Sequence, residues 1–260
     1  MAHEVINVNY LHDGQVVEIV LGPGPGNIVT ARLIQEISTE IGILTDGSPD
    51  NRSRKLIVFT GEGEHFSYGA SVEEHKAESV GEMLPQFHRL IGEILECDIP
   101  TLAKVSGLCL GGGFELALSC AMIFSAGDAK FGVPEIQLGV FPPVASVLLP
   151  HKMAESAASQ MILTGAKVSA GELQRLGVVH AATGSIDDSV EQFIQKQILP
   201  KSASSLRFAC RAARAGIRRQ YRENIAEVER LYLDQLMATA DAREGIDAFL
   251  EKRSPKWTHK

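Results

Sequence analysis

The chain has 260 residues, of which 45% are apolar and 22% charged, and its formal net charge is −7 at pH 7. This composition predicts a globular protein with enough apolar residues for one large core. The acidic balance argues against a nucleic-acid surface, which needs a concentrated basic face. No segment is apolar over the length that a membrane-spanning helix requires.

Other features bear on location and metal content. The first residues, MAHEVINVNY, lack the basic start and apolar centre of an export signal. The eight histidines and four cysteines show no spacing typical of a metal site, and no CxxC pair is present. We therefore expect a cytoplasmic protein with no metal site and with neither a nucleic acid nor a membrane as partner.

The first half of the chain predicts strands and helices in alternation. Residues 5–22 alternate apolar and polar positions around Asp13-Gly14, which is typical of a hairpin. Apolar residues at helical spacing predict helices over 30–44 and 81–96 and another beginning near Phe114. Short apolar runs with glycine after them predict buried strands at 56–61, 101–107 and 121–127. This order predicts an α/β fold with right-handed crossovers.

Past about Pro200 the pattern becomes helical. Residues 203–217 and 219–239 are rich in Ala, Arg, Glu and Leu, and no strand pattern lies between them. We predict two parts, an α/β core of residues 1–199 and a helical C-terminal part of residues 200–260.

A run of three glycines, Gly111 to Gly113, lies where a predicted strand ends and a helix begins. Glycine lets the backbone approach a ligand closely, and the first N–H groups of a helix have no partner within it. Such a corner suits an anion or an oxygen that becomes anionic during a reaction. A close crossing of helix and strand would require the same small residues.

Two glutamates stand in apolar stretches near glycine-rich turns. Glu115 follows the glycines in GGGFELAL, and Glu135 lies in FGVPEIQLGVF. A carboxylate at the start of a helix can simply complement the helix dipole. Alternatively, two buried carboxyl groups can form an acid/base pair, because burial and mutual repulsion keep one protonated while the other is ionised.

An earlier turn, Tyr68-Gly69-Ala70, follows the strand at 56–61. It could present a second backbone N–H, since oxyanion pockets commonly use two donors. An ordinary surface loop is the alternative.

These motifs, HFSYGAS, GLCLGGGFELAL and AKFGVPEIQLGVFP, resemble those of the crotonase (enoyl-CoA hydratase) superfamily in order and spacing. The resemblance covers nearly the whole chain. It implies an α/β core built as a spiral of ββα turns, with a helical C-terminal part that forms trimers, often paired into hexamers. It also implies a coenzyme A thioester as substrate and no further cofactor, since CoA is part of the substrate.

The same resemblance assigns roles to individual residues. The backbone N–H groups of Tyr68 and Gly112 would hold the thioester carbonyl oxygen, and Glu115 and Glu135 would carry the acid and base steps of hydration. CoA would contact Ser67 and Ala70. From FLEKR near the C-terminus, Phe249 and Lys252 would reach its adenine and phosphates, often from a neighbouring subunit.

A narrower resemblance concerns the substrate. FSYGASVEEH, GVFPPVASVLLP, SASSLRFACRAAR and FLEKRSPKW are similar to segments of cyclohexa-1,5-diene-1-carbonyl-CoA hydratases of anaerobic benzoyl-CoA degradation. Where ordinary enoyl-CoA hydratases carry Asp after Gly-Ala and PGAGG after the second glutamate, this chain has Ser71 and PPVAS. Both changes fall where the acyl group would sit, and they favour a ring over a straight chain.

Three functions follow from these patterns. The first is hydration of cyclohexa-1,5-diene-1-carbonyl-CoA to 6-hydroxycyclohex-1-ene-1-carbonyl-CoA. The second keeps the fold and changes the reaction to straight-chain hydration, isomerisation or ring hydrolysis. The third is a non-catalytic binding protein with, for example, an RNA partner, against which the acidic balance and the glutamate pair both argue.

Overall fold

The computed structural model describes residues 5–22, 24, 26–76 and 78–260. Its larger sheet has six strands in the order β1-β2-β3-β4-β6-β9. The first pair is antiparallel and every later pair is parallel. The strands are β1 (Ile6–Leu11), β2 (Val16–Leu21), β3 (Leu56–Gly61), β4 (Thr101–Val105), β6 (Met122–Ser125) and β9 (His180–Ala181).

A second sheet of three short strands lies beside the first, in the order β5-β7-β8. These are β5 (Leu108–Leu110), β7 (Lys130–Gly132) and β8 (Val168–Ser169). Strands of two or three residues carry too little periodicity to stand out in a sequence, so this sheet was not predicted. It matters for the site, because β5 leads directly into the glycine run.

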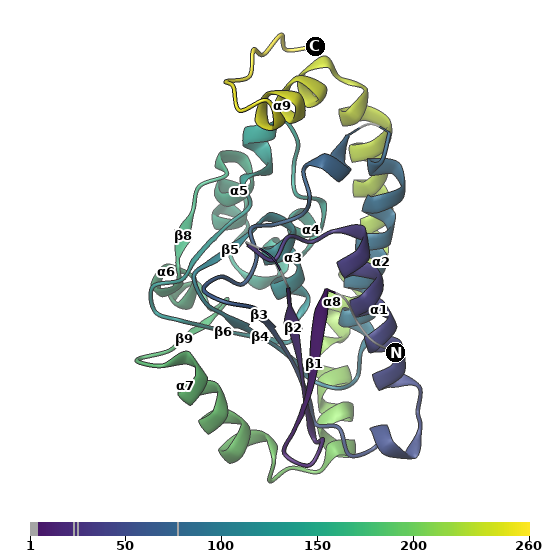
Figure 1. Cartoon of the computed structure of the whole chain (residues 1–260), viewed down its shortest axis with the longest axis vertical. Coiled ribbons are helices and arrows are strands. Elements are labelled where there is room, and N and C mark those ends of the chain that lie inside the picture. The colour runs from purple at the N-terminus through teal and green to yellow at the C-terminus, as the bar shows by residue number, and fades with distance from the viewer. Residues whose placement is uncertain (1–4, 23, 25, 77) are drawn as a thin grey trace.

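Helices cover the sheets and continue to the C-terminus. In Figure 1, α1, α2 and α8 stand side by side along one side of the larger sheet, and α7 lies apart from them near β9. The helices are α1 (Ala31–Thr45), α2 (Val80–Glu96), α3 (Gly111–Ser119), α4 (Pro143–Lys152), α5 (Glu155–Thr164), α6 (Ala170–Arg175), α7 (Ile186–Phe193), α8 (Ala203–Arg230) and α9 (Ala240–Leu250).

Most predicted elements are confirmed within a few residues. The hairpin turns through His12, Asp13 and Gly14, which all have positive φ, and Thr30 caps α1 by accepting a hydrogen bond from the N–H of Leu33. Two details were wrong. Helix α3 begins at Gly111 instead of near Phe114, and residues 203–230 form one continuous helix because Gly216 does not interrupt it.

The predicted α/β fold with a helical C-terminal region is confirmed. Helix α8 shares the main core with the rest of the chain, since Ile217 and Tyr221 belong to the same apolar cluster as the strand residues Ile19 and Phe59. The boundary near residue 200 as a domain limit stays a prediction.

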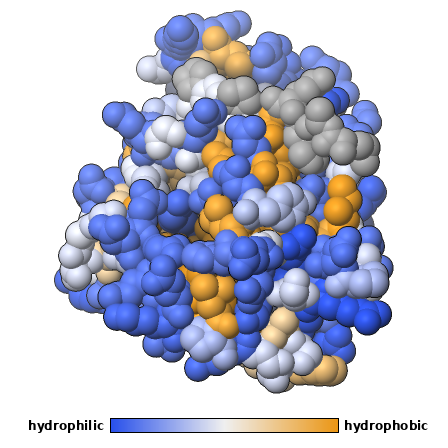
Figure 2. All heavy atoms as spheres, turned by 60° about the horizontal axis from the view of Figure 1, so that its bottom comes forward, coloured by the Kyte–Doolittle hydropathy of each residue, from blue (hydrophilic) through white to orange (hydrophobic). Residues whose placement is uncertain are grey.

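The surface is largely hydrophilic on the face shown in Figure 2, with hydrophobic side chains gathered in small separate groups. Among the residues that the structure describes, no helix is both long enough and apolar enough to cross a bilayer.

Candidate active site

The glycine corner forms where the turn Gly69-Ala70 meets the start of α3. A side chain at Gly69 would approach the carbonyl oxygen of Leu110 to 3.1 Å, and one at Gly112 would approach the backbone nitrogen of Ala70 to 3.3 Å. The two backbones are therefore in direct contact. Gly111 has φ +48°, a conformation that glycine adopts without strain, and this turns the chain sharply from β5 into α3.

Glu115 lies on the first turns of α3 and is only 4% exposed. Its Oε1 accepts a hydrogen bond of 2.8 Å from the N–H of Ala145, near the start of α4. Burial raises the pKa of Glu115 to about 7, although the N–H groups of Ala145 and Val144 work in the opposite direction by favouring the ionised form. Glu115 is thus a carboxyl group whose protonation changes near neutral pH.

Glu135 belongs to η3 (Pro134–Leu138), a single 3-10 turn between β7 and α4. A Cβ atom at Gly111 would come within 2.7 Å of its Oε1, which places the carboxyl group against the glycine corner. Its Oε2 is buried and has no hydrogen-bond partner among the described residues. Burial raises the pKa of Glu135 well above its ordinary value, and the charge of Glu115 raises this pKa further.

The structure therefore brings the two glutamates together from different elements. Glu115 has two backbone N–H groups to stabilise its charge, whereas Glu135 faces the charge of Glu115. Glu115 should therefore ionise first, with Glu135 still protonated. The pair can hold one proton and one negative charge at neutral pH.

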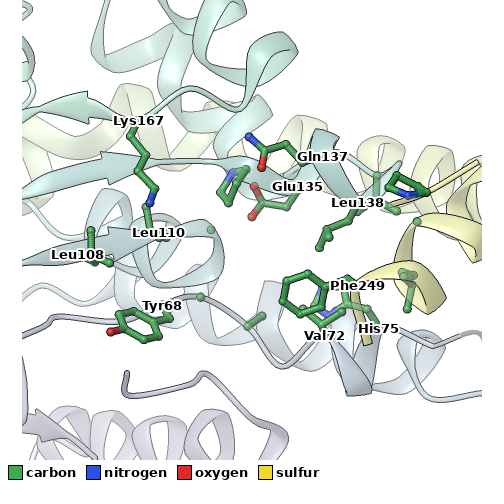
Figure 3. Close-up of a pocket in the computed structure, with 18 of the residues that line it drawn as sticks. Tyr68, Val72, His75, Leu108, Leu110, Glu135, Gln137, Leu138, Lys167 and Phe249 are labelled. Atoms are coloured by element: carbon green, nitrogen blue, oxygen red, sulfur yellow. The ribbon is translucent and has the colours of Figure 1, made fainter. Parts of the chain in front are cut away.

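A cavity of about 490 Å³ opens in front of this corner. In Figure 3 the carboxyl group of Glu135 points into it, between Lys167 and Gln137 on one side and Phe249 and Val72 on the other. Glu115 is not among the lining residues and lies behind the wall. Apolar side chains form much of the lining, namely Val72, Leu108, Leu110, Leu138, Val140 and Ile246.

The predicted donor Tyr68 is the clearest disagreement between sequence and structure. Its backbone N–H already donates to the carbonyl of Gly26, at 2.7 Å, so it is not available to a thioester oxygen. The N–H of Ala70 has no hydrogen-bond partner among the described residues, and Ala70 contacts Gly112. Of these two N–H groups, the one free to donate is therefore that of Ala70, two residues along the same turn.

Ser67 also has a different role from the one expected. It is fully buried, its hydroxyl donates to the carbonyl of Asn27 at 2.8 Å, and it accepts from the N–H of Gly69 at 3.1 Å. Ser67 does not line the cavity. It holds the turn in place instead of contacting a ligand.

At the C-terminal end, Phe249 lines the cavity and Lys252 does not. The cationic side chains among the lining residues are Lys167, just before β8, and Arg253, after α9. The guanidinium of Arg253 is paired with Glu244 and Glu251. Lys167 did not stand out in the sequence, because it is a single cation outside any motif, whereas Arg253 belongs to the FLEKR segment, from which only Phe249 and Lys252 were assigned a role.

Two further side chains near the site were not assigned a role from the sequence. His75 lines the cavity, and its Nδ1 donates to the carbonyl of Ser71 at 2.7 Å. Burial lowers the pKa of His75, which favours a neutral ring with Nε2 as an acceptor. Tyr232 is 1% exposed, and burial raises its pKa, as do the charges of Glu135 and Glu115. Among the described residues, no group of three His, Cys, Asp or Glu side chains could hold a metal ion.

Comparison with known proteins places this site in a family. The family model for enoyl-CoA hydratase/isomerase matches residues 16–260. The chain belongs to the enoyl-CoA hydratase/isomerase family. It is therefore an enzyme of a family that acts on CoA thioesters, and its general class of reaction is that of a hydro-lyase.

Individual relatives agree with this membership. The chain is 38% identical over 248 residues to cyclohexa-1,5-dienecarbonyl-CoA hydratase of Thauera aromatica, with 95% of each chain covered. It is 32% identical to a probable enoyl-CoA hydratase of Mycobacterium bovis over the full length of both. The crystal structure of an enoyl-CoA hydratase from Mycobacterium avium subsp. paratuberculosis shares the fold, with a TM-score of 0.85, 23% identity, and 99% and 100% of the two chains covered.

Proposed function

We propose that this member of the family adds water to a cyclic conjugated dienoyl-CoA, converting cyclohexa-1,5-diene-1-carbonyl-CoA to 6-hydroxycyclohex-1-ene-1-carbonyl-CoA in anaerobic aromatic degradation. The observation that carries the proposal is the interacting pair Glu115 and Glu135 at the glycine corner, with Glu135 on the wall of the cavity and Glu115 buried behind it. Hydration needs a base for water and an acid for carbon, and this pair supplies both.

The glycine corner provides the electrostatic part of the mechanism. The N–H groups of Ala70 and Gly112 would donate to the thioester carbonyl oxygen, on which negative charge develops as water adds. Gly112 is the second residue of α3, so its N–H has no partner within the helix. The positive end of the α3 dipole favours the same charge.

The glutamates divide the proton transfers. Ionised Glu115 takes a proton from water as the water oxygen bonds to the β carbon of the ring. Protonated Glu135 gives its proton to the far carbon of the conjugated system, and the remaining double bond shifts next to the thioester. One proton leaves water and one reaches carbon, so a further proton exchange between the pair or with solvent restores the starting state.

Support for a cyclic substrate comes from the relative in Thauera aromatica and from the local sequence. The segment Pro142 to Ser146 replaces a glycine-rich loop, and Pro143 opens α4, where Ala145 holds Glu115. The apolar residues Leu138 and Val140 also line the cavity, Leu138 from the same turn as Glu135 and Val140 through the hydrogen bond of its N–H to the carbonyl of Glu135. A rigid, apolar wall beside the acid suits a ring better than a mobile chain.

The test is a comparison of substrates. Purified protein is incubated with the cyclic dienoyl-CoA and with crotonyl-CoA, and products are followed by mass. We expect hydration of the cyclic thioester with kcat/KM at least about tenfold higher than for crotonyl-CoA, since shape differences of this size change transition-state binding by about 1–3 kcal/mol. A preference for crotonyl-CoA would instead support the second candidate, straight-chain enoyl-CoA hydration, which the match to the Mycobacterium bovis protein favours.

The assembly and the location belong to the same proposal. We propose a homotrimer, or a hexamer of two trimers, in the cytoplasm. Phe208 on α8 and Leu231 just after it are 68% and 45% exposed, which suits a contact between subunits. Light scattering during size-exclusion chromatography measures the mass, and a monomer would contradict the assembly.

A further inference from the structure

Tyr232 is a buried aromatic residue that the mechanism above does not use. It lies in η5 (Leu231–Gln235), directly after α8, and is 1% exposed. Among the described residues its hydroxyl has no hydrogen-bond partner. A buried hydroxyl without a partner is costly, because it has lost water and gained nothing in return. Such a group calls for a functional explanation.

The surroundings of Tyr232 connect it to the acid side of the site. Its ring packs edge-on against Phe141, with ring centroids 5.4 Å apart. It shares an apolar cluster with Val140 and Ile246, which both line the cavity. The N–H of Val140 donates to the backbone carbonyl of Glu135 at 3.2 Å. Tyr232 therefore stands behind the wall that carries Glu135.

Two unpartnered polar atoms occur in this one region. One is the hydroxyl oxygen of Tyr232, which can donate, and the other is Oε2 of Glu135, which can accept. The charges of Glu135 and Glu115 both act on the tyrosine hydroxyl. Hydrogen bonds at catalytic groups often tighten only in the complex with substrate.

We propose that Tyr232 is a positioning residue whose hydroxyl donates a hydrogen bond to the carboxylate of Glu135 that forms when this glutamate releases its proton. The inference rests on the proposed function and deepens it, because it explains how a strongly held proton is released. Without a donor, burial and the neighbouring charge make Glu135 a weak acid. A neutral donor stabilises the ionised form and makes proton delivery easier.

Other titratable groups surround the pair. Glu115 approaches from α3, and Tyr221 from α8, where its hydroxyl donates to the carbonyl of His88 at 2.7 Å. The remaining groups line the cavity from three further segments: His75 in η2 (Glu73–His75), Lys167 before β8 and Arg253 after α9. Among the described residues, none of the three forms a hydrogen bond with Tyr232 or with Glu135. Tyr232 stays a neutral donor through the working range because its pKa is raised.

The experiment compares Tyr232→Phe with Tyr221→Phe in the full chain. Both changes remove one hydroxyl from a buried tyrosine near the carboxyl pair, but only the Tyr221 hydroxyl has a partner. For Tyr232→Phe we expect kcat to fall about 10- to 100-fold with KM changed less than about threefold, within the range of effects on general acid catalysis. The thermal midpoint should stay the same or rise, because an unpartnered hydroxyl is removed. Tyr221→Phe should lower the midpoint and leave kcat within about twofold.

The pH profile separates a positioning role from a structural one. Activity on the alkaline side is lost as Glu135 gives up its proton. Removing the donor raises the pKa of Glu135, so the alkaline limb of the Tyr232→Phe profile should move to higher pH. The expected shift is about one pH unit, because the free energy of a hydrogen bond to a charged group is similar to that of a one-unit pKa change. A fluorinated tyrosine placed at position 232 donates more strongly and should move the limb downward.

The outcomes keep this inference distinct from the proposed function. If Tyr232→Phe and Tyr221→Phe give the same kcat and the same pH profile, Tyr232 has no positioning role, even where the glutamate variants are inactive. A Tyr232→Phe protein with a lowered midpoint and an unmoved alkaline limb assigns the hydroxyl to structure alone and overturns the inference. If the unchanged protein hydrates no enoyl thioester, the proposed function itself is wrong, and the inference that rests on it falls with it.

Discussion

The two walls of the cavity are built in different ways. The wall from the α/β core includes the glycine corner, where backbone at Gly69, Ala70 and Gly111 lines the cavity and the turn touches the start of α3. The wall from the C-terminal helices consists of side chains such as Ile246 and Phe249, the latter 54% exposed. A backbone wall has little freedom to vary, whereas a side-chain wall changes with each substitution. We infer that the first wall fixes the reaction and the second adjusts what is bound.

The largest effects are expected at the two glutamates of the α/β core, Glu135 on the wall and Glu115 behind it. Glu115→Gln and Glu135→Gln should each lower kcat by about 10²- to 10⁴-fold, because an amide neither accepts a proton from water nor delivers one to carbon. In the unchanged protein kcat/KM should decrease as the pH is lowered below about 7, because Glu115 then gains a proton and can no longer act as the base.

Initial rates across pH measure both effects, and circular dichroism with thermal unfolding checks that each variant folds. Hydration by either variant at near-normal rates would show that the pair does not carry the reaction.

A smaller effect tests the backbone wall itself. In Gly112→Ala the new Cβ would lie 3.1 Å from Cβ of Ala70 and 3.3 Å from its nitrogen, so the turn has to move by a few tenths of an ångström. We expect kcat to fall about 10²-fold, as for loss of one oxyanion donor, and KM to change little. Initial rates over a range of substrate concentrations, up to saturation, measure kcat and KM.

Gly92→Ala is the matched control, because its new Cβ would find only Tyr221 at 3.6 Å, an ordinary contact inside α2. This change should leave kcat unaltered and stabilise the fold by about 0.5–1 kcal/mol. Equal losses of activity in both alanine variants would mean that the corner has no special role.

The smallest effect concerns the entrance to the cavity. Lys167→Ala should raise KM for a CoA thioester about three- to tenfold, because an exposed cation contributes about 1 kcal/mol to binding a phosphate. KM for the same acyl group on a short thiol without phosphates should not change. Steady-state kinetics with the two thioesters make the comparison.

Lys252→Ala is the control, since Lys252 does not line the cavity. A larger KM effect at Lys252 than at Lys167 would support the role that the sequence predicted for Lys252, with CoA reaching it from a different direction or from another subunit.

The fold was predictable where a pattern is long or has strong punctuation. The continuous run Leu56–Gly61 and the helix from Thr30 both match the structure closely, because burial on two faces and a capping hydroxyl leave clear marks in a sequence. The three-residue strands β5 and β7 left none. The start of α3 was misplaced, since glycine is a poor helix former and only tertiary contacts make Gly111 to Gly113 helical.

The site residues likewise fall into those that the sequence predicted and those that it did not. Glu115 and Glu135 were found because a carboxyl group in an apolar stretch is unusual in any fold. Tyr68 was assigned in place of Ala70, because the choice between neighbouring N–H groups depends on the bond from Tyr68 to Gly26, 42 positions earlier. Tyr232 gave no signal at all, because a single tyrosine in a helical stretch is commonplace.

The sequence by itself determined which chemistry is present: two carboxyl groups in apolar surroundings and glycines that expose backbone donors. These are properties of residue type and of short spacing, and they do not depend on distant contacts. Tertiary structure alone decided which N–H groups are unoccupied, which glutamate has donors to support its charge, and which tyrosine stands beside the acid. The reason is that hydrogen-bond partners and burial are set by segments that meet only after the chain folds.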